Sequence, residues 1–225
     1  MTTALDIINR ASSTMQDADF VRWSKAELLE YVSEAQVMVS HSPGAYSVRK
    51  VIDLAEGSRQ ALPADTWSLI SVVRNVDEDD VPITPVRLVS RSLLDAAVPL
   101  WHMEPKAPLV ENYVYDDKVP REILVYPPND GKGRVEVVYI GIPAKITDEN
   151  EELVTDSSFD AAILLYVLYK AYCKESDYAP GVSNASAYYE AYKGELDMAS
   201  QVRGRVSPNA SLMPNTAVNA NGGTE

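Results

Sequence analysis

Histidine and cysteine, the residues most often found in catalytic and metal sites, are scarce in this chain. Its 225 residues include two histidines, His41 and His102, and one cysteine, Cys173. The histidines are far apart and form neither H-x-x-x-H nor H-E-x-x-H, the spacings with which a helix presents two imidazoles to zinc. No base adjoins Cys173 that could activate its thiol. We therefore expect all three residues to be structural, with His41 at a helix C-terminus, where partial positive charge is favourable.

The pair Gly131-Lys132 resembles part of a phosphate-binding loop but lacks the rest of that motif. The motif needs a glycine five residues before the Gly-Lys pair, where this chain has Tyr126, and Ser or Thr after the lysine, where it has Gly133. No G-x-S-x-G nucleophile elbow occurs in the chain. The sequence therefore predicts a protein that is not an enzyme and that needs no cofactor or metal.

Two acidic clusters are the remaining candidates for chemistry. Asp77–Asp80 are four consecutive acids, and six more lie between Lys145 and Lys170, a stretch without basic residues. Neighbouring carboxylates can bind divalent cations, so a carboxylate-dependent hydrolase is an alternative function. The other interpretation is a solvated loop whose charge is favourable at a helix N-terminus. The second cluster comprises Asp148, Glu149, Glu151, Glu152, Asp156 and Asp160.

Tyrosine is unusually frequent, with 13 tyrosines against 2 phenylalanines. Because a phenol joins an apolar ring to a polar tip, such a group suits either a helix–helix core or a surface that is buried in a complex. Tyr188 and Tyr192 share one face of an expected helix, and Tyr189 points about 100° away, so one direction is free for a partner. We expect Tyr189→Ala, or Tyr188→Ala with Tyr192→Ala, to harm assembly more than monomer stability. The candidate interface residues are Tyr166, Tyr169, Tyr172, Tyr188, Tyr189 and Tyr192.

The overall composition is that of a globular chain with a strong acidic excess. Twenty Lys and Arg against 33 Asp and Glu give a formal net charge of −13. This charge argues against gripping nucleic acid through its phosphates and against docking on anionic lipid. No apolar run approaches the ~20 residues that span a bilayer, and the N-terminus lacks the features of a signal peptide. We expect synthesis in a reducing cytoplasm and no membrane association.

Hydrophobic periodicity and turn residues predict helices at both ends of the chain and strands in the middle. Ser24 and Glu27 predict a capping box that starts the second helix. The pair Asp130-Gly131 predicts a hairpin between the last two strands. The stretch 55–65 reads as a loop or turn. The expected helices are 3–16, 24–40, 91–97, 156–176 and 184–202, and the expected strands are 46–54, 66–76, 110–116, 120–126 and 133–142.

This order predicts an α+β fold. The N-terminal helices (1–44) and the C-terminal helices (147–204) are expected to form one helical bundle. A small antiparallel β-unit (45–146) is inserted between them. The last segment, 205–225, has few apolar residues to offset its ordering entropy, so we expect a flexible tail that is disordered in isolation.

Several stretches of the chain resemble phage head-to-tail adaptor proteins of the tail tubular protein A-like family. Each motif is weak alone, but they occur in the family's order over most of residues 20–195. They are Trp23–Gln36, Arg59–Asp65, Val73–Asn75, Pro99–Trp101, Ile123–Pro128, Ser158–Tyr172, Asp177–Ala179 and Ala187–Tyr192.

The resemblance implies a virion protein at the head–tail junction, made in the host cytoplasm and without enzymatic activity. It implies a ring, usually of twelve copies, that joins the portal to the tail nozzle and forms part of the channel through which DNA passes without specific binding. The bundle would form the ring wall, and the β-unit would face the tail. A neck, head-completion or tail-terminator protein of a long-tailed phage is the alternative.

Two further expectations follow from the ring. A channel for DNA must avoid gripping phosphate, so Asp148, Glu149, Glu151 and Glu152 are candidate channel-lining residues. The segment Val206–Glu225 is expected to fold onto a neighbouring adaptor or the portal, and its deletion should weaken assembly while leaving the monomer folded.

Overall fold

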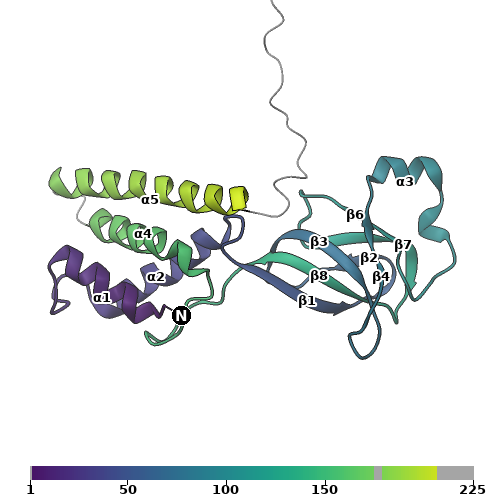
Figure 1. Ribbon diagram of the computed structural model, residues 1–225, viewed down its shortest axis with the longest axis horizontal. Helices are drawn as coiled ribbons and strands as arrows, with labels where there is room; N and C mark the ends of the chain where they lie inside the picture. The colour runs from purple at the N-terminus through teal and green to yellow at the C-terminus, as the bar shows by residue number, and fades with distance from the viewer. Residues whose placement is uncertain (1, 175–178, 207–225) are drawn as a thin grey trace, which may run out of the picture.

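The computed structural model describes residues 2–174 and 179–206, which fold into a helical part and a β part joined end to end (Figure 1). The fold class is α+β, as predicted, with two sheets in which most strand pairs are antiparallel. The helices are α1 (Ala4–Met15), α2 (Lys25–Ser40), α3 (Arg91–Ala97), α4 (Asp160–Cys173) and α5 (Ala179–Val206), with 3-10 turns η1 (Trp101–Met103) and η2 (Ser157–Phe159).

Helix α1 and helix α2 begin at the residues that the sequence indicates. Thr3 caps α1, and the Thr3 backbone N–H donates to the Asp6 carboxylate, which completes a capping box. The Ser24 hydroxyl accepts from the N–H of Glu27 at 3.3 Å. The Glu27 carboxylate binds Tyr31 and Lys174, so the structure shows only the serine half of the box predicted there.

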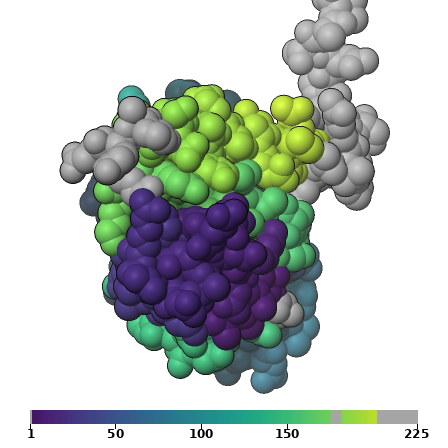
Figure 2. Space-filling model, turned by 90° about the vertical axis from the view of Figure 1, so that its left-hand side faces the viewer, coloured from purple at the N-terminus to yellow at the C-terminus, as the bar shows by residue number. Residues whose placement is uncertain are grey.

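One hydrophobic cluster is shared by α1, α2, α4 and α5. Its fully buried members include Ile7 of α1, Leu28 of α2 and Ile163 of α4, and α5 contributes Tyr192. Burial of such side chains stabilises a fold by roughly 1.5–3 kcal/mol each. Viewed from the end of the helical part, α1 and α2 form the front surface and α5 runs along the upper side (Figure 2).

The β part is a sandwich of two four-stranded sheets, with orders β1-β8-β3-β4 and β2-β7-β6-β5. Buried residues of both sheets, among them Val72 and Val137 from one and Tyr113 and Val125 from the other, form a second core. The pair β5–β6 is parallel. The strands are β1 (Ser47–Asp53), β2 (Glu56–Ala61), β3 (Thr66–Val76), β4 (Pro82–Pro85), β5 (Arg87–Leu88), β6 (Asn112–Tyr115), β7 (Glu122–Asp130) and β8 (Arg134–Gly141).

The stretch predicted as a loop at 55–65 contains strand β2, so that prediction was wrong. The strand has the sequence EGSRQA, without the β-branched residues that signal a strand. Its buried Gln60 accepts from the N–H of Ala55 at 2.6 Å and donates to the carbonyls of Ala55 and Gly57. Edge position and these side-chain contacts, rather than propensity, define the strand. The short strands β4 and β5 were also missed.

The predicted hairpin between the last two strands is wrong as well, because β7 and β8 lie in different sheets. The chain crosses between the sheets at Gly131–Gly133, held by the buried Asn129. The Asn129 side chain accepts from the N–H groups of Gly131 and Gly133 and donates to the carbonyls of Ala107 and Pro108. A Cβ at Gly133 would lie 2.4 Å from the Pro108 carbonyl oxygen, so this position requires glycine.

The C-terminal helices differ from the prediction at their boundaries. Asp156 caps η2, and α4 then begins at Asp160. Helix α5 begins at Ala179 rather than near 184, because Pro180 is tolerated in a first helical turn, where its missing N–H is no loss. It continues to Val206, two residues into the predicted tail. Residues 207–225, and with them the predictions about the rest of the tail, lie outside the described residues, as do residues 177–178 of the predicted turn.

The helical and β parts meet where the chain passes between them twice. On the first pass Ala45 accepts from the N–H of Asp156 at 2.9 Å, and on the second the N–H of Ile146 donates to the hydroxyl of Ser33 at 3.1 Å. Within the described ranges, no helix has the length and apolar content to cross a membrane.

Candidate interaction surfaces

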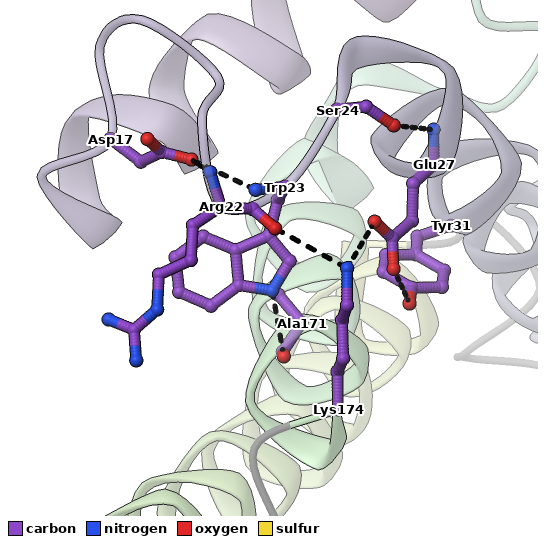
Figure 3. Close-up of polar contacts among 8 residues, drawn as sticks. All are labelled: Asp17, Arg22, Trp23, Ser24, Glu27, Tyr31, Ala171 and Lys174. Atoms are coloured by element: carbon purple, nitrogen blue, oxygen red, sulfur yellow. Dashed lines mark hydrogen bonds and ion pairs between the residues drawn. The ribbon is translucent and has the colours of Figure 1, made fainter.

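A network around Trp23 fastens the α1–α2 loop to the end of α4 (Figure 3). The Asp17 carboxylate accepts from the N–H groups of Val21, Arg22 and Trp23, each at 3.0 Å. The fully buried indole of Trp23 donates to the Ala171 carbonyl at 3.0 Å. These bonds fix the position of the C-terminal end of α4, where Tyr172 lies.

Lys174 closes the same network from α4. Its ammonium donates to the Arg22 carbonyl at 3.3 Å and to the Glu27 carboxylate at 2.7 Å (Figure 3). The Lys174 ammonium lowers the pKa of Glu27. The backbone N–H of Trp23, with those of Arg22 and Val21, holds the pKa of Asp17 below its ordinary value of 3.8.

We expect Asp17→Asn to lower the stability of the protein at pH 7, because a neutral amide is a weaker acceptor for three N–H donors. The folded-state pKa of Asp17 is depressed, so its contribution is present above 3.8 and is lost as the pH falls through the folded pKa. The stability difference between wild type and variant should therefore shrink below 3.8. Urea unfolding at pH 7 and at about pH 3 measures it. A constant difference would contradict the assigned role of the carboxylate.

The six candidate tyrosines form a ladder of ring contacts between α4 and α5. The ring centroids of Tyr166 and Tyr192 are 5.3 Å apart, those of Tyr169 and Tyr189 5.0 Å, and those of Tyr172 and Tyr188 5.4 Å. The Tyr166 hydroxyl donates to Glu34 at 2.7 Å, and burial, followed by that bond, raises the Tyr166 pKa. The ladder joins α4 to α5 within one subunit.

The α5 side chains that the sequence places in two directions, Tyr188 with Tyr192 and Tyr189, therefore all contact α4. Tyr192 is buried, with 5% of its surface exposed, and Tyr188 is half-buried against Tyr172. Tyr189 keeps 40% of its surface exposed. Beside it lies an apolar hollow of about 250 Å³, which Val182 also lines. Of the three α5 tyrosines, Tyr189 is thus the one with most surface left for a partner.

The acidic loop 147–152 is a structured element that packs on the start of α1. The carbonyls of Glu149 and Glu151 accept from the N–H groups of Leu5 and Ala4. The Glu151 carboxylate accepts from the N–H groups of Thr147 and Asp148, and the N–H of Thr147, followed by that of Asp148, lowers the pKa of Glu151. The Asp148 carboxylate likewise accepts from the N–H of Asn150, which lowers the pKa of Asp148. Two of the four candidate acids thus hold the loop in shape.

Of the remaining two acids, Glu152 is exposed and Glu149 is half-buried. The Glu149 carboxylate pairs with Lys25 at 3.3 Å. Over the described ranges, no three His, Cys, Asp or Glu side chains are grouped so that they could hold a metal ion. Because the loop carbonyls bond to the first N–H groups of α1, the acidic loop lies at the N-terminus of that helix. Negative charge is favourable at this end of a helix.

The two histidines stack on tryptophans in separate parts of the molecule. The ring centroids of His102 and Trp101 are 3.5 Å apart, and the His102 Nδ1 is 2.8 Å from the Ser58 hydroxyl. His41 caps the end of α2 as predicted and stacks on Trp67 at 4.5 Å. Burial lowers the His41 pKa, so the structure favours a neutral imidazole rather than the positive charge that the sequence suggested. Cys173 is a half-buried free thiol beside the hollow at Tyr189.

Sequence reasoning missed an exposed pair on β3, Trp67 and Ile70. The available signal was a break in alternation, because apolar residues stand at 67, 69, 70, 72 and 73 instead of at every second position. Such a break is what β-bulges produce. The strand was predicted, but the bulges that turn these side chains outward were not.

Comparison with known proteins gives one family. The model of the family described as SU10 adaptor protein matches residues 2–214. Among curated proteins, no sequence matches the chain.

Proposed function

Because the chain belongs to the SU10 adaptor protein family, a family of phage head-to-tail adaptors, we propose that it forms a ring joining the portal to the tail nozzle. The observation that carries this proposal is the extent of the family match, which includes all described residues of both parts. A phage adaptor of this family is a structural protein and a component of the virion. The copy number, the channel and the portal contact are the parts that we propose.

In this proposal the four long helices act as one bundle in the ring wall, and the β part faces the tail. The shared core of α1, α2, α4 and α5 supports the first point, since a wall element must be rigid. The exposed edge of Tyr189 and the hollow beside it support a contact through α5. The structural use of Asp148 and Glu151 favours an adaptor over a carboxylate-dependent hydrolase.

The test is to mix the purified full chain with the portal of the same phage. We expect a complex that sediments faster than the portal alone, and electron micrographs should show a closed ring, of twelve copies if the family's usual number holds. A neck or tail-terminator protein would bind tail components and leave the portal unchanged. Binding to neither portal nor nozzle, by a folded protein, would refute the proposal.

A further inference from the structure

The two sheets of the β part differ in how their outer faces are covered. On the sheet β2-β7-β6-β5, α3 and η1 lie against β6 and β7 through a small core of Leu94, Trp101 and Val114 (Figure 1). Trp101 is fully buried there. Among the described elements, no helix packs extensively on β1, β8 or β3 of the other sheet. The second sheet therefore has an outer face without an internal cover.

Three irregularities in β3 shape this uncovered face. The pairing of β3 with β8 shifts between Thr66 and Ser68, between Leu69 and Ser71, and between Val72 and Arg74. Each shift leaves one extra residue in β3, and the first two extra residues are Trp67 and Ile70. A β-bulge re-aims the extra side chain. Trp67 is 41% exposed and Ile70 is 53% exposed.

The neighbouring residues of the middle strand make this region apolar. In β8, Tyr139 and Val137 point into the core, so the alternate residues Ile140 and Val138 lie on the outer face, where they are half-buried. We call the surface of Trp67, Ile70, Val138 and Ile140 the β3–β8 face.

The β3–β8 face carries little charge where it adjoins the helical part. In one cross-strand row, Ile140 of β8 lies between Ser47 of β1 and Ser68 of β3. In the next row, Val138 lies between Arg49 and Ser71, and the Arg49 guanidinium is paired with Glu136 at 3.1 Å. Free charge is thus absent from these two rows, on a chain with a formal net charge of −13.

Trp67 is held in place on this face. Its ring stacks on His41 with an interplanar angle of 15°. A hollow of about 370 Å³ beside it is lined by Ser68, Tyr115, Asp117 and Pro120. A rigid aromatic side chain with an adjacent hollow is typical of an interface anchor, because little rotamer entropy is lost when a partner covers it.

We propose that the β3–β8 face is covered by a second copy of this chain in the assembled adaptor. Copies that each carry a net charge of −13 repel one another, so close contact is favoured at surfaces with few free acidic groups, and the rows at Ile140 and Val138 carry none. Four side chains bury less than the ~800 Å² per partner of a stable two-protein interface. The face therefore suits one contact among several in a ring. This inference rests on the proposed function, from which it takes the presence of several copies.

The occupant is identified by photocrosslinking from the face itself. The full chain carries p-benzoylphenylalanine in place of Ile70, is assembled on the portal and is irradiated, and the products are analysed by mass spectrometry. We expect a crosslink between two copies of the chain. A crosslink to the portal, or within one chain to residues 207–225, would overturn the proposal and leave the adaptor function standing.

A charge test measures whether the contact matters. Ile70→Lys buries an ammonium if the face is covered, and we expect assembly to need at least about tenfold more protein. The matched control is Val81→Lys, because Val81 is exposed to the same 53% but lies just before β4. Both variants must keep the wild-type unfolding midpoint, as substitutions at exposed positions do. Equal assembly of the two variants would overturn the proposal.

Fluorescence gives a readout that does not depend on a charge change. Trp23 and Trp101 are at most 1% exposed, so acrylamide quenching of the free protein reports mainly on Trp67. Quenching should fall several-fold on assembly, and Trp67→Phe should abolish that change. Unchanged quenching in sedimented rings would refute the proposal that the β3–β8 face is covered, and it would leave the adaptor function standing. If the wild type forms no assembly with or without portal, the proposed function fails as well.

Discussion

Replacing Tyr192 with alanine should lower the free energy of unfolding of the monomer by about 3–5 kcal/mol, the usual cost of removing a buried aromatic side chain. Tyr192 is 5% exposed and belongs to the core that unites α1, α2, α4 and α5. Its ring contacts Tyr166 edge-on with the ring centroids 5.3 Å apart, so the deletion also removes one of the aromatic contacts of Tyr166. Urea unfolding of the full chain, followed by circular dichroism, measures the loss.

The matched variants are Tyr192→Phe and Tyr189→Ala. The phenylalanine keeps the ring, so we expect a loss of less than about 1.5 kcal/mol. Tyr189 is 40% exposed, so its removal should cost the monomer much less than the removal of Tyr192. If Tyr189 contacts a partner, Tyr189→Ala should instead weaken ring formation. An unchanged midpoint for Tyr192→Ala would show that the helical core is not organised around this residue.

The burial of Tyr192 changes what the double variant can show. Tyr188 stacks on Tyr172 and Tyr192 packs in the core, so Tyr188→Ala with Tyr192→Ala should destabilise the monomer severely. The sequence suggested that this pair would affect assembly more than stability. The single change Tyr189→Ala is therefore the variant that separates an interface role from a core role.

Replacing Glu149 and Glu152 with lysine should slow DNA ejection at low salt if the acidic loop lines the channel. Each new ammonium near the DNA path adds a phosphate contact, and contacts from all copies of a ring act together. Because such contacts weaken as salt screens them, the ejection rate should recover at high salt. Ejection from purified particles, followed across salt concentrations, measures the effect.

Asp148 and Glu151 are left unchanged in this experiment. Their carboxylates accept hydrogen bonds from N–H groups of the loop, so lysine there would disrupt the loop and confuse a structural effect with an electrostatic one. The control is Glu104→Lys with Glu111→Lys, which adds the same charge on exposed residues of the β part. Normal low-salt ejection from particles shown to contain the Glu149→Lys/Glu152→Lys ring would place the loop away from the channel.

Local chemistry determined much of the helical part. The Ser24 cap, the apolar spacing behind it and the stop before Pro43 define α2 without reference to any other segment. The absence of a recognisable catalytic motif and the order of the family's motifs likewise pointed to an adaptor from the sequence alone. These signals lie within one or a few helical turns, where propensity and hydrogen bonding are local.

Contacts between distant segments decided the rest. The Asp130-Gly131 pair specifies a turn, but only the packing of two sheets, with Asn129 bonded to Ala107 and Pro108, sends β8 into the other sheet. Spacing on α5 placed Tyr188 and Tyr189 in different directions, and only the proximity of α4 showed that both are used. The outward turn of Trp67 depends on the register between β3 and β8 and on His41 at the end of α2. Register and burial arise from residues far apart in the chain, so periodicity within one segment cannot determine them.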